Sequence, residues 1–154
     1  MKMVIQRVSR GDVKVEGEVC GRIDRGFLVL LGVGQGDTRE IADKMIKKMM
    51  GLRIFADENG KTNLALKDVG GNLLIISQFT LYADCSHGYR PGFTDAADAS
   101  LAEELYEYVL SECRKEFPDL QCGRFGEHME VSLLNEGPFT ILLDSRDICP
   151  SGQK

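Results

Sequence analysis

Polar side chains interrupt an otherwise apolar segment near the middle of the chain. Residues 73–76 are Leu-Leu-Ile-Ile, and Ser77, Gln78 and Thr80 follow almost directly. If a strand carries these side chains inward, their hydroxyl and amide groups must find hydrogen-bond partners or line a pocket. Such groups can donate to a developing oxyanion or hold an attacking water. The segment is a candidate hydrolytic site, although threonine is also common in ordinary strands.

A second candidate segment covers residues 135–140, which are Asn-Glu-Gly-Pro-Phe-Thr. It separates two apolar stretches, residues 130–134 and 139–143, so we expect two strands joined by a turn. Gly137-Pro138 is also where a cis peptide bond is energetically accessible. A cis bond would fix the neighbouring carbonyls in an unusual direction, and the segment is therefore either a turn alone or a piece of backbone that faces a ligand.

Other chemistry-bearing residues give weaker signals. His87 and His128 lie far in sequence from any plausible Ser or Cys nucleophile, so we expect surface or structural roles for both. The five cysteines are widely spaced, and neither a C-x-x-C pair nor an H-E-x-x-H motif occurs. This pattern predicts free thiols and no metal. The glycines at 32–36 lack the spacing of a nucleotide-binding loop, so no cofactor is expected.

The elements that must position these segments alternate between strand and helix patterns. Strand patterns occupy residues 4–8, 13–16, 27–31 and 73–76. Apolar residues at helical spacing predict one helix over residues 41–52, begun by an Asp37 N-cap, and another over residues 101–117. The order predicts a single α/β domain with two main helices and a mixed, largely antiparallel, barrel-like sheet.

Composition narrows the function classes. The chain has 154 residues, of which 43% are hydrophobic and 28% charged, as in an ordinary globular domain. No stretch approaches the roughly 18 apolar residues of a membrane span, and the first residues lack the apolar region of a signal peptide. A formal net charge of −5 disfavours a protein that grips a long nucleic-acid duplex. We therefore expect a cytosolic protein with no membrane partner.

Six short motifs occur in order through residues 1–145. They are Ile5-Gln6-Arg7-Val8, Gly51-x-Arg53-Ile54-Phe55, Ser77-Gln78-Phe79-Thr80-Leu81, Arg90-Pro91-x-Phe93, Met129-x-Val131-Ser132-Leu133 and Asn135-x-Gly137-Pro138-x-Thr140. Together they resemble the D-aminoacyl-tRNA deacylase family, and the third and sixth motifs are highly specific as a pair. The resemblance implies a deacylase domain over residues 1–145, with residues 146–154 as a polar C-terminal tail.

The resemblance implies a two-fold homodimer with its active sites at the interface. Ser77, Gln78, Phe79 and Thr80 would line the pocket, and Gly137-Pro138 would reach into the pocket of the partner. Thr80 would act either as a nucleophile or, with Gln78, in positioning the ester while the terminal adenosine's 2′-hydroxyl assists a water. The sequence slightly favours positioning, because Thr80 has no obvious base beside it.

The implied substrate is the 3′ end of aminoacyl-tRNA, whose ester would be hydrolysed to free amino acid and tRNA. A narrow backbone slot would reject L-residues by leaving no room for Cβ, and it would not reject glycyl-tRNA by the same means. Two positions depart from the family pattern: Gly92, where serine is more frequent, and Phe139, where valine is more common. Both bear on the loop or the pocket wall.

Two other functions fit parts of the sequence. One is a related editing deacylase that removes a misattached L-residue, but residues 77–80 keep the signature of the D-specific family. The other is a nucleic-acid (DNA) binding module on the same fold without deacylase activity. The acidic net charge weakens that alternative.

Overall fold

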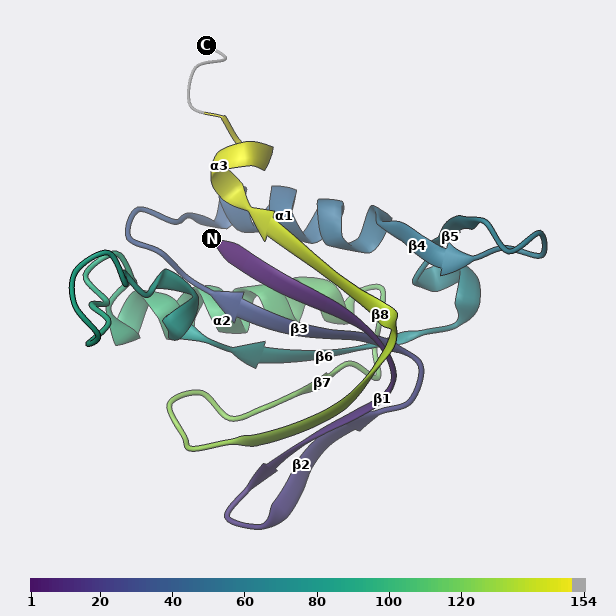
Figure 1. Ribbon diagram of the computed structural model, residues 1–154, viewed down its shortest axis with the longest axis horizontal. Coiled ribbons are helices and arrows are strands. Elements are labelled where there is room, and N and C mark those ends of the chain that lie inside the picture. Colours follow the sequence, from purple (N-terminus) through teal and green to yellow (C-terminus); the bar gives the residue numbers. More distant parts are fainter. Residues whose placement is uncertain (151–154) are drawn as a thin grey trace.

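A six-stranded sheet forms the centre of the molecule, and α1 and α2 pack together on one of its faces (Figure 1). The computed structural model describes residues 1–150. The strands are β1 (Lys2–Val15), β2 (Glu18–Ile23), β3 (Gly26–Gly32), β4 (Arg53–Ala56), β5 (Thr62–Ala65), β6 (Asn72–Ser77), β7 (Gln121–Cys122) and β8 (Glu130–Asp144). The helices are α1 (Arg39–Gly51), α2 (Ala99–Arg114) and the short α3 (Ser145–Ile148), with 3-10 turns η1 (Lys67–Val69) and η2 (Phe79–Tyr82).

The long strand β1 organises the sheet. Its first half pairs with β3, its second half pairs with β2, and β8 runs along its other edge, all antiparallel. Strands β3 and β6, and then β6 and β7, pair in parallel. Because β1 bends between its two halves, β8 curls back over the sheet (Figure 1). The predicted fold class, a mixed and largely antiparallel barrel-like sheet with two main helices, is confirmed.

Strands β3 and β6 are apolar on both faces because both faces are covered. Phe27, Val29 and Leu31 point towards the two helices and join the larger core. Leu28 and Leu74 point to the opposite side, into a smaller core enclosed by the curled sheet. The continuous apolar runs of the sequence therefore predicted these two buried strands correctly.

Helix α1 forms as predicted, but its N-cap is Thr38 rather than Asp37. The Thr38 hydroxyl accepts a hydrogen bond from the Ile41 N–H at 3.3 Å. The Asp37 carboxylate is buried and accepts bonds from the Met1 amino group and the Gly34 N–H, each at 2.7 Å. The capping prediction was wrong because a partner distant in sequence holds the carboxylate that a local pattern assigned to the helix.

The segment at 135–138 is a bulge within one strand, not a turn between two. In the pairing of β1 with β8, Gln6 lies opposite Thr140 and Val8 lies opposite Asn135. Residues 136–139 therefore protrude from the ladder opposite the single residue Arg7. The two-strand prediction was wrong because β1 continues past the Gly-Pro pair and keeps β8 aligned on both sides of it. Likewise, the two strand patterns at 4–8 and 13–16 belong to the single strand β1.

The first residues of the predicted polar tail belong to a short helix. Residues 145–148 form α3, and the Ser145 N–H donates to the Met1 carbonyl at 2.9 Å. Positions 151–154 lie outside the described residues. Among residues 1–150, no helix has the length and apolar character that a membrane crossing requires.

Candidate active site

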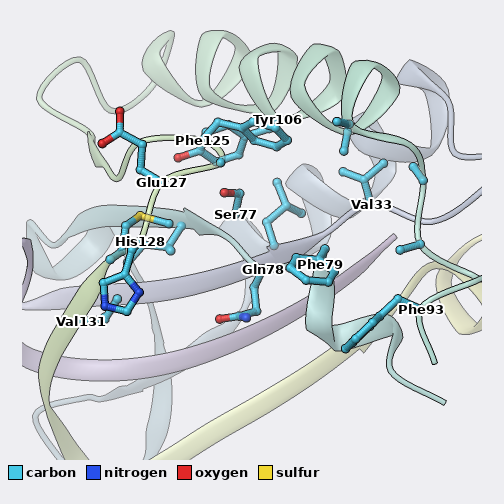
Figure 2. A pocket seen from close by; sticks show the side chains of 18 residues that line it. Val33, Ser77, Gln78, Phe79, Phe93, Tyr106, Phe125, Glu127, His128 and Val131 are labelled. Carbon is cyan, nitrogen blue, oxygen red and sulfur yellow. The ribbon is translucent and has the colours of Figure 1, made fainter. Parts of the chain in front are cut away.

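A cavity of about 570 Å³ opens where β6 ends. Tyr106 and Phe125 lie on the side next to α2, and Phe79 and Phe93 form the adjoining wall (Figure 2). The polar residues Ser77 and Gln78 lie between these aromatic walls and the segment around residues 127–131. The site is thus largely apolar with a few polar groups on its floor, as is typical of small-molecule sites.

The local backbone explains how the floor residues enter the cavity. The Gln78 N–H donates to the Leu31 carbonyl at 2.8 Å, which extends the parallel pairing of β6 with β3 by one residue. The chain then tightens into η2, and this turn leaves the Phe79 ring 56% exposed. That ring meets Phe93 edge-on, with centroids 4.9 Å apart. The exposed aromatic pair offers a surface on which another planar ring can stack.

Three of the four predicted pocket residues, Ser77, Gln78 and Phe79, line the cavity, and Thr80 does not. The Thr80 hydroxyl accepts a hydrogen bond from the side-chain amide of Gln78. The amide nitrogen of Gln78 is therefore engaged, and its orientation depends on Thr80. The structure thus assigns Thr80 a partner, whereas its catalytic role stays a prediction.

Arg7 holds the second candidate segment in place. The peptide bond of Gly137-Pro138 is cis, as expected. The Arg7 guanidinium donates through Nε to the Glu136 carbonyl at 3.2 Å and through Nη1 to the Ile54 carbonyl at 2.6 Å. It also lies over the Phe139 ring, 4.7 Å from the centroid. Sequence analysis placed Arg7 only within a motif, because these contacts join three segments that are far apart in the chain.

Asn135 fixes the other side of the bulge. Its side-chain oxygen accepts a bond from the Phe139 N–H at 2.8 Å, and its amide nitrogen donates to the Thr140 hydroxyl at 2.9 Å. Gly137 has φ of +130°, a conformation that L-residues rarely adopt. The bulge is therefore held by the side chain of Arg7 from β1 and by that of Asn135 from β8.

The bulge and the cavity of one chain do not meet. Gly137 and Pro138 are not among the residues that line the cavity. Figure 1 shows the bend of β8 beside β4, at the end of the sheet opposite to the arrowhead of β6, from which the cavity opens. The two candidate segments are therefore brought to opposite ends of the same molecule.

The two histidines differ in their relation to the site. His128 is exposed and lines the cavity together with Glu127 and Met129, which sequence analysis did not assign to a site. Met129 appeared only within a motif and no local pattern marked Glu127, because these residues reach the cavity only when β8 pairs with β1. His87 lies in an exposed loop, where its Nδ1 and the Ser86 hydroxyl share a hydrogen bond of 2.8 Å. Both side chains are exposed, and the roles expected for them stay predictions.

Tyr106 forms part of the cavity wall, and a hydrogen bond holds its phenol in place. Its hydroxyl donates to the Ile75 carbonyl at 2.8 Å, and burial raises its pKa well above the usual value for tyrosine. The phenol therefore stays protonated at neutral pH. Within residues 1–150, no group of three or more His, Cys, Asp or Glu side chains is arranged to hold a metal ion.

Comparison with known proteins identifies the family. A family model described as D-Tyr-tRNA(Tyr) deacylase matches residues 4–144. The chain belongs to this deacylase family. The D-aminoacyl-tRNA deacylase of Thermosipho africanus is 49% identical over 148 residues, covering 96% of this chain and 99% of that protein. The enzyme of the same name from Stutzerimonas stutzeri is 50% identical over 145 residues, covering 94% of this chain and all of its own length. These matches confirm the resemblance found in the sequence motifs.

Solved structures confirm the deacylase fold. A protein described as c-Myc DNA Unwinding Element Binding Protein superposes with a TM-score of 0.89 at 39% identity, covering 94% of this chain and 98% of that one. A probable eukaryotic D-amino acid tRNA deacylase superposes with a TM-score of 0.80 over 92% of this chain. Its identity is 16%, so this second likeness concerns the fold alone.

Proposed function

We propose that this chain hydrolyses the ester bond of D-aminoacyl-tRNA and releases a free D-amino acid and tRNA. The observation that carries the proposal is the cavity with Ser77 and Gln78 on its floor and the exposed Phe79 ring at its wall, in a member of the deacylase family. At about 570 Å³ the cavity suits an aminoacyl group joined to one nucleoside. The 3′ end of tRNA is single-stranded, and its bases can stack on exposed aromatic rings.

The chemistry needs little from the protein beyond alignment. Water attacks the ester carbonyl carbon, the bond from that carbon to the ribose oxygen breaks, and the ribose oxygen leaves with a proton taken from the water. The ester is already activated, so holding it near a water supplies much of the required rate. We assign the floor residues Ser77 and Gln78 to holding the ester, and the 2′-hydroxyl of the terminal adenosine to assisting the water.

Substitution of Thr80 distinguishes this mechanism from covalent catalysis, in which Thr80 would be the nucleophile. Its hydroxyl lies outside the cavity lining and accepts a bond from Gln78, so we assign it to orienting that amide. Thr80→Ala should retain most of the single-turnover deacylation rate, and Thr80→Ser, which keeps the hydroxyl, should match the wild type. Mass spectrometry of quenched reactions then checks for an adduct. Trapping an acyl group on Thr80 would contradict the positioning mechanism.

We further propose that the active form is a homodimer in which Gly137-Pro138 of one copy enters the cavity of the other. Three observations support this arrangement. The bulge lies away from its own cavity, and β8 pairs only with β1 among residues 1–150, which leaves its second edge open. That strand also exposes large apolar side chains, with Leu142 75% and Leu134 45% accessible. An open strand edge of this kind is able to pair with another chain.

Sedimentation velocity tests the dimer. The wild type should sediment as a dimer, and Leu142→Asp should shift it towards the monomer and abolish deacylation together. A matched control is Val19→Asp, because Val19 is also exposed, at 43%, but lies on β2. A wild-type monomer with full activity would contradict the shared site.

Selectivity would follow from exclusion of the L-residue Cβ by the inserted backbone. Glycine has no Cβ, so the same slot should accept glycyl-tRNA. Initial rates with D-tyrosyl-, L-tyrosyl- and glycyl-tRNA measure this directly, and L-tyrosyl-tRNA should be spared. If glycyl-tRNA were fully resistant while D-tyrosyl-tRNA was cleaved, exclusion of Cβ could not be the basis of selection.

DNA binding is the weaker alternative. It is favoured by the likeness to the protein described as c-Myc DNA Unwinding Element Binding Protein. A net charge of −5 opposes binding along a duplex. A deacylation assay with purified protein separates the two functions. A substrate carried on tRNA also leads us to place the activity in the cytosol.

A further inference from the structure

Four cationic side chains surround a hollow of about 610 Å³ on the outer side of α1, and none of Ser77, Gln78 and Phe79 lines it. We call them the basic patch: Lys44, Lys47 and Lys48 of α1, and Arg53 of β4. Leu52 and Ile148 form part of the hollow's lining. All four cations are exposed, and no acidic residue lines the hollow.

The basic patch lacks internal counter-charges. Elsewhere on the surface, Arg39 pairs with Glu104 and Lys115 pairs with Glu112. Within residues 1–150, by contrast, none of the four cations forms a salt bridge. Lys44 lies three and four positions before the other two lysines, so like charges are neighbours on one helix face. In a chain of net charge −5, this concentration of unpaired positive charge points to an anionic ligand.

The patch is connected to the Gly137-Pro138 bulge. Arg53 directly precedes Ile54, whose carbonyl accepts the bond from Arg7, and Arg7 also donates to the Glu136 carbonyl. Figure 1 shows α1 running towards β4, which lies beside the bend of β8. Arg53 of the patch therefore lies beside the segment to which Arg7 ties the bulge.

This placement identifies the anion. On the function and dimer proposed above, the bulge of one copy enters the cavity of the other, so the patch of the first copy flanks that cavity. The 3′ end of tRNA lies in the cavity, and the phosphates of its acceptor stem must leave past the flanking surface. We propose that the basic patch binds phosphates of the tRNA backbone. A protein with a net negative charge can then bind a polyanion through this one local surface.

Neutralising the lysines tests this proposal. The variant Lys44→Gln/Lys47→Gln/Lys48→Gln keeps good helix formers at all three positions. Its matched control, Lys14→Gln/Lys67→Gln/Lys115→Gln, removes the same charge from exposed lysines outside the patch. Two substrates are compared for each protein: D-tyrosyl-tRNA, and the D-tyrosyl ester of adenosine, which has no phosphates.

The patch variant should raise KM for D-tyrosyl-tRNA by roughly tenfold and leave kcat unchanged, while both parameters for the adenosine ester stay at wild-type values. Binding of deacylated tRNA, followed by fluorescence anisotropy at several salt concentrations, gives a second readout. The slope of log Kd against log salt should fall by about 2 to 3, because each lost phosphate contact removes ~0.9.

An unchanged KM and salt slope in the patch variant would overturn the proposal, and so would an equal change in the control. Both results leave the proposed function intact as long as the adenosine ester is cleaved. Failure of the wild type to cleave either substrate would instead remove the proposed function itself. Circular dichroism of both triple variants confirms that α1 remains folded.

Discussion

Replacing Arg7 with alanine tests whether the bulge must be held rigidly. The change removes a part-buried hydrogen bond to the Ile54 carbonyl, an exposed one to the Glu136 carbonyl and the contact with the Phe139 ring. The part-buried hydrogen bond from the charged donor contributes about 1.5 kcal/mol, the cation–π contact contributes about 0.5 kcal/mol, and the exposed hydrogen bond to Glu136 is screened by solvent and adds little. We therefore expect a loss of about 2 kcal/mol in the energy that holds the bulge in its observed conformation.

If the rigid bulge stabilises the transition state by this 2 kcal/mol, kcat/KM for D-tyrosyl-tRNA falls about 30-fold in Arg7→Ala. Single-turnover deacylation measures the rate, and chemical denaturation measures the accompanying change in the free energy of unfolding. Discrimination against L-tyrosyl-tRNA should weaken in parallel, because a mobile bulge excludes Cβ less well. Loss of discrimination is the result that a general loss of stability does not produce.

Arg25→Ala is the matched control for this experiment. Arg25 also stacks on an aromatic ring, with its guanidinium 5.0 Å from the centroid of Phe55, a ring that Arg7 contacts at 5.9 Å. It makes none of the hydrogen bonds by which Arg7 holds the bulge. We expect wild-type activity and selectivity from Arg25→Ala. Equal effects of the two substitutions, or full selectivity in Arg7→Ala, would refute the reasoning.

Three further predictions concern the supporting structure. Asp98→Ala removes the side chain that caps α2 with a 2.9 Å bond and should lower the free energy of unfolding by about 1 kcal/mol in urea titrations; no change would show that the cap is dispensable. Tyr106→Phe removes one of two donors to the buried Ile75 carbonyl, which keeps the Gly123 N–H at 3.4 Å, and should cost about 1 kcal/mol by the same measurement, with no loss of kcat, because the phenol stays protonated. Burial raises the pKa of the Cys113 thiol to about 12, so this thiol stays protonated at pH 8 and should react with a thiol reagent only after unfolding. The exposed Cys85 should react in the folded protein. Labelling followed by peptide mapping measures the reactivity of each cysteine.

Periodic patterns were sufficient for the elements of the core. The run at 27–31 and the helical stripe at 41–52 predicted β3 and α1 because burial on both faces, or on one stripe, leaves a direct mark on residue order. The same reasoning misplaced the N-cap of α1. Asp37 and Thr38 both suit that position, and only the buried contact of Asp37 with Met1 decides between them.

The sequence likewise predicted one part of the candidate site and missed another. The motif at 77–80 marked the cavity floor from sequence, because polar residues at the end of a buried strand are conspicuous. The other walls come from Phe93, Tyr106 and the segment at 125–131, which no local pattern brings together. Thr80 shares the motif but not the cavity, since the 3-10 turn after Ser77 directs successive side chains to different sides.

By itself the sequence determined the family, the buried strands and the two chemical segments, because each depends on residues close together in the chain. The tertiary structure alone decided that the Gly137-Pro138 segment is a bulge held by Arg7 and that it lies away from its own cavity. The physical reason is that strand register and the contacts of a long side chain depend on which distant segments pair. A pattern of neighbouring residues carries no record of that pairing.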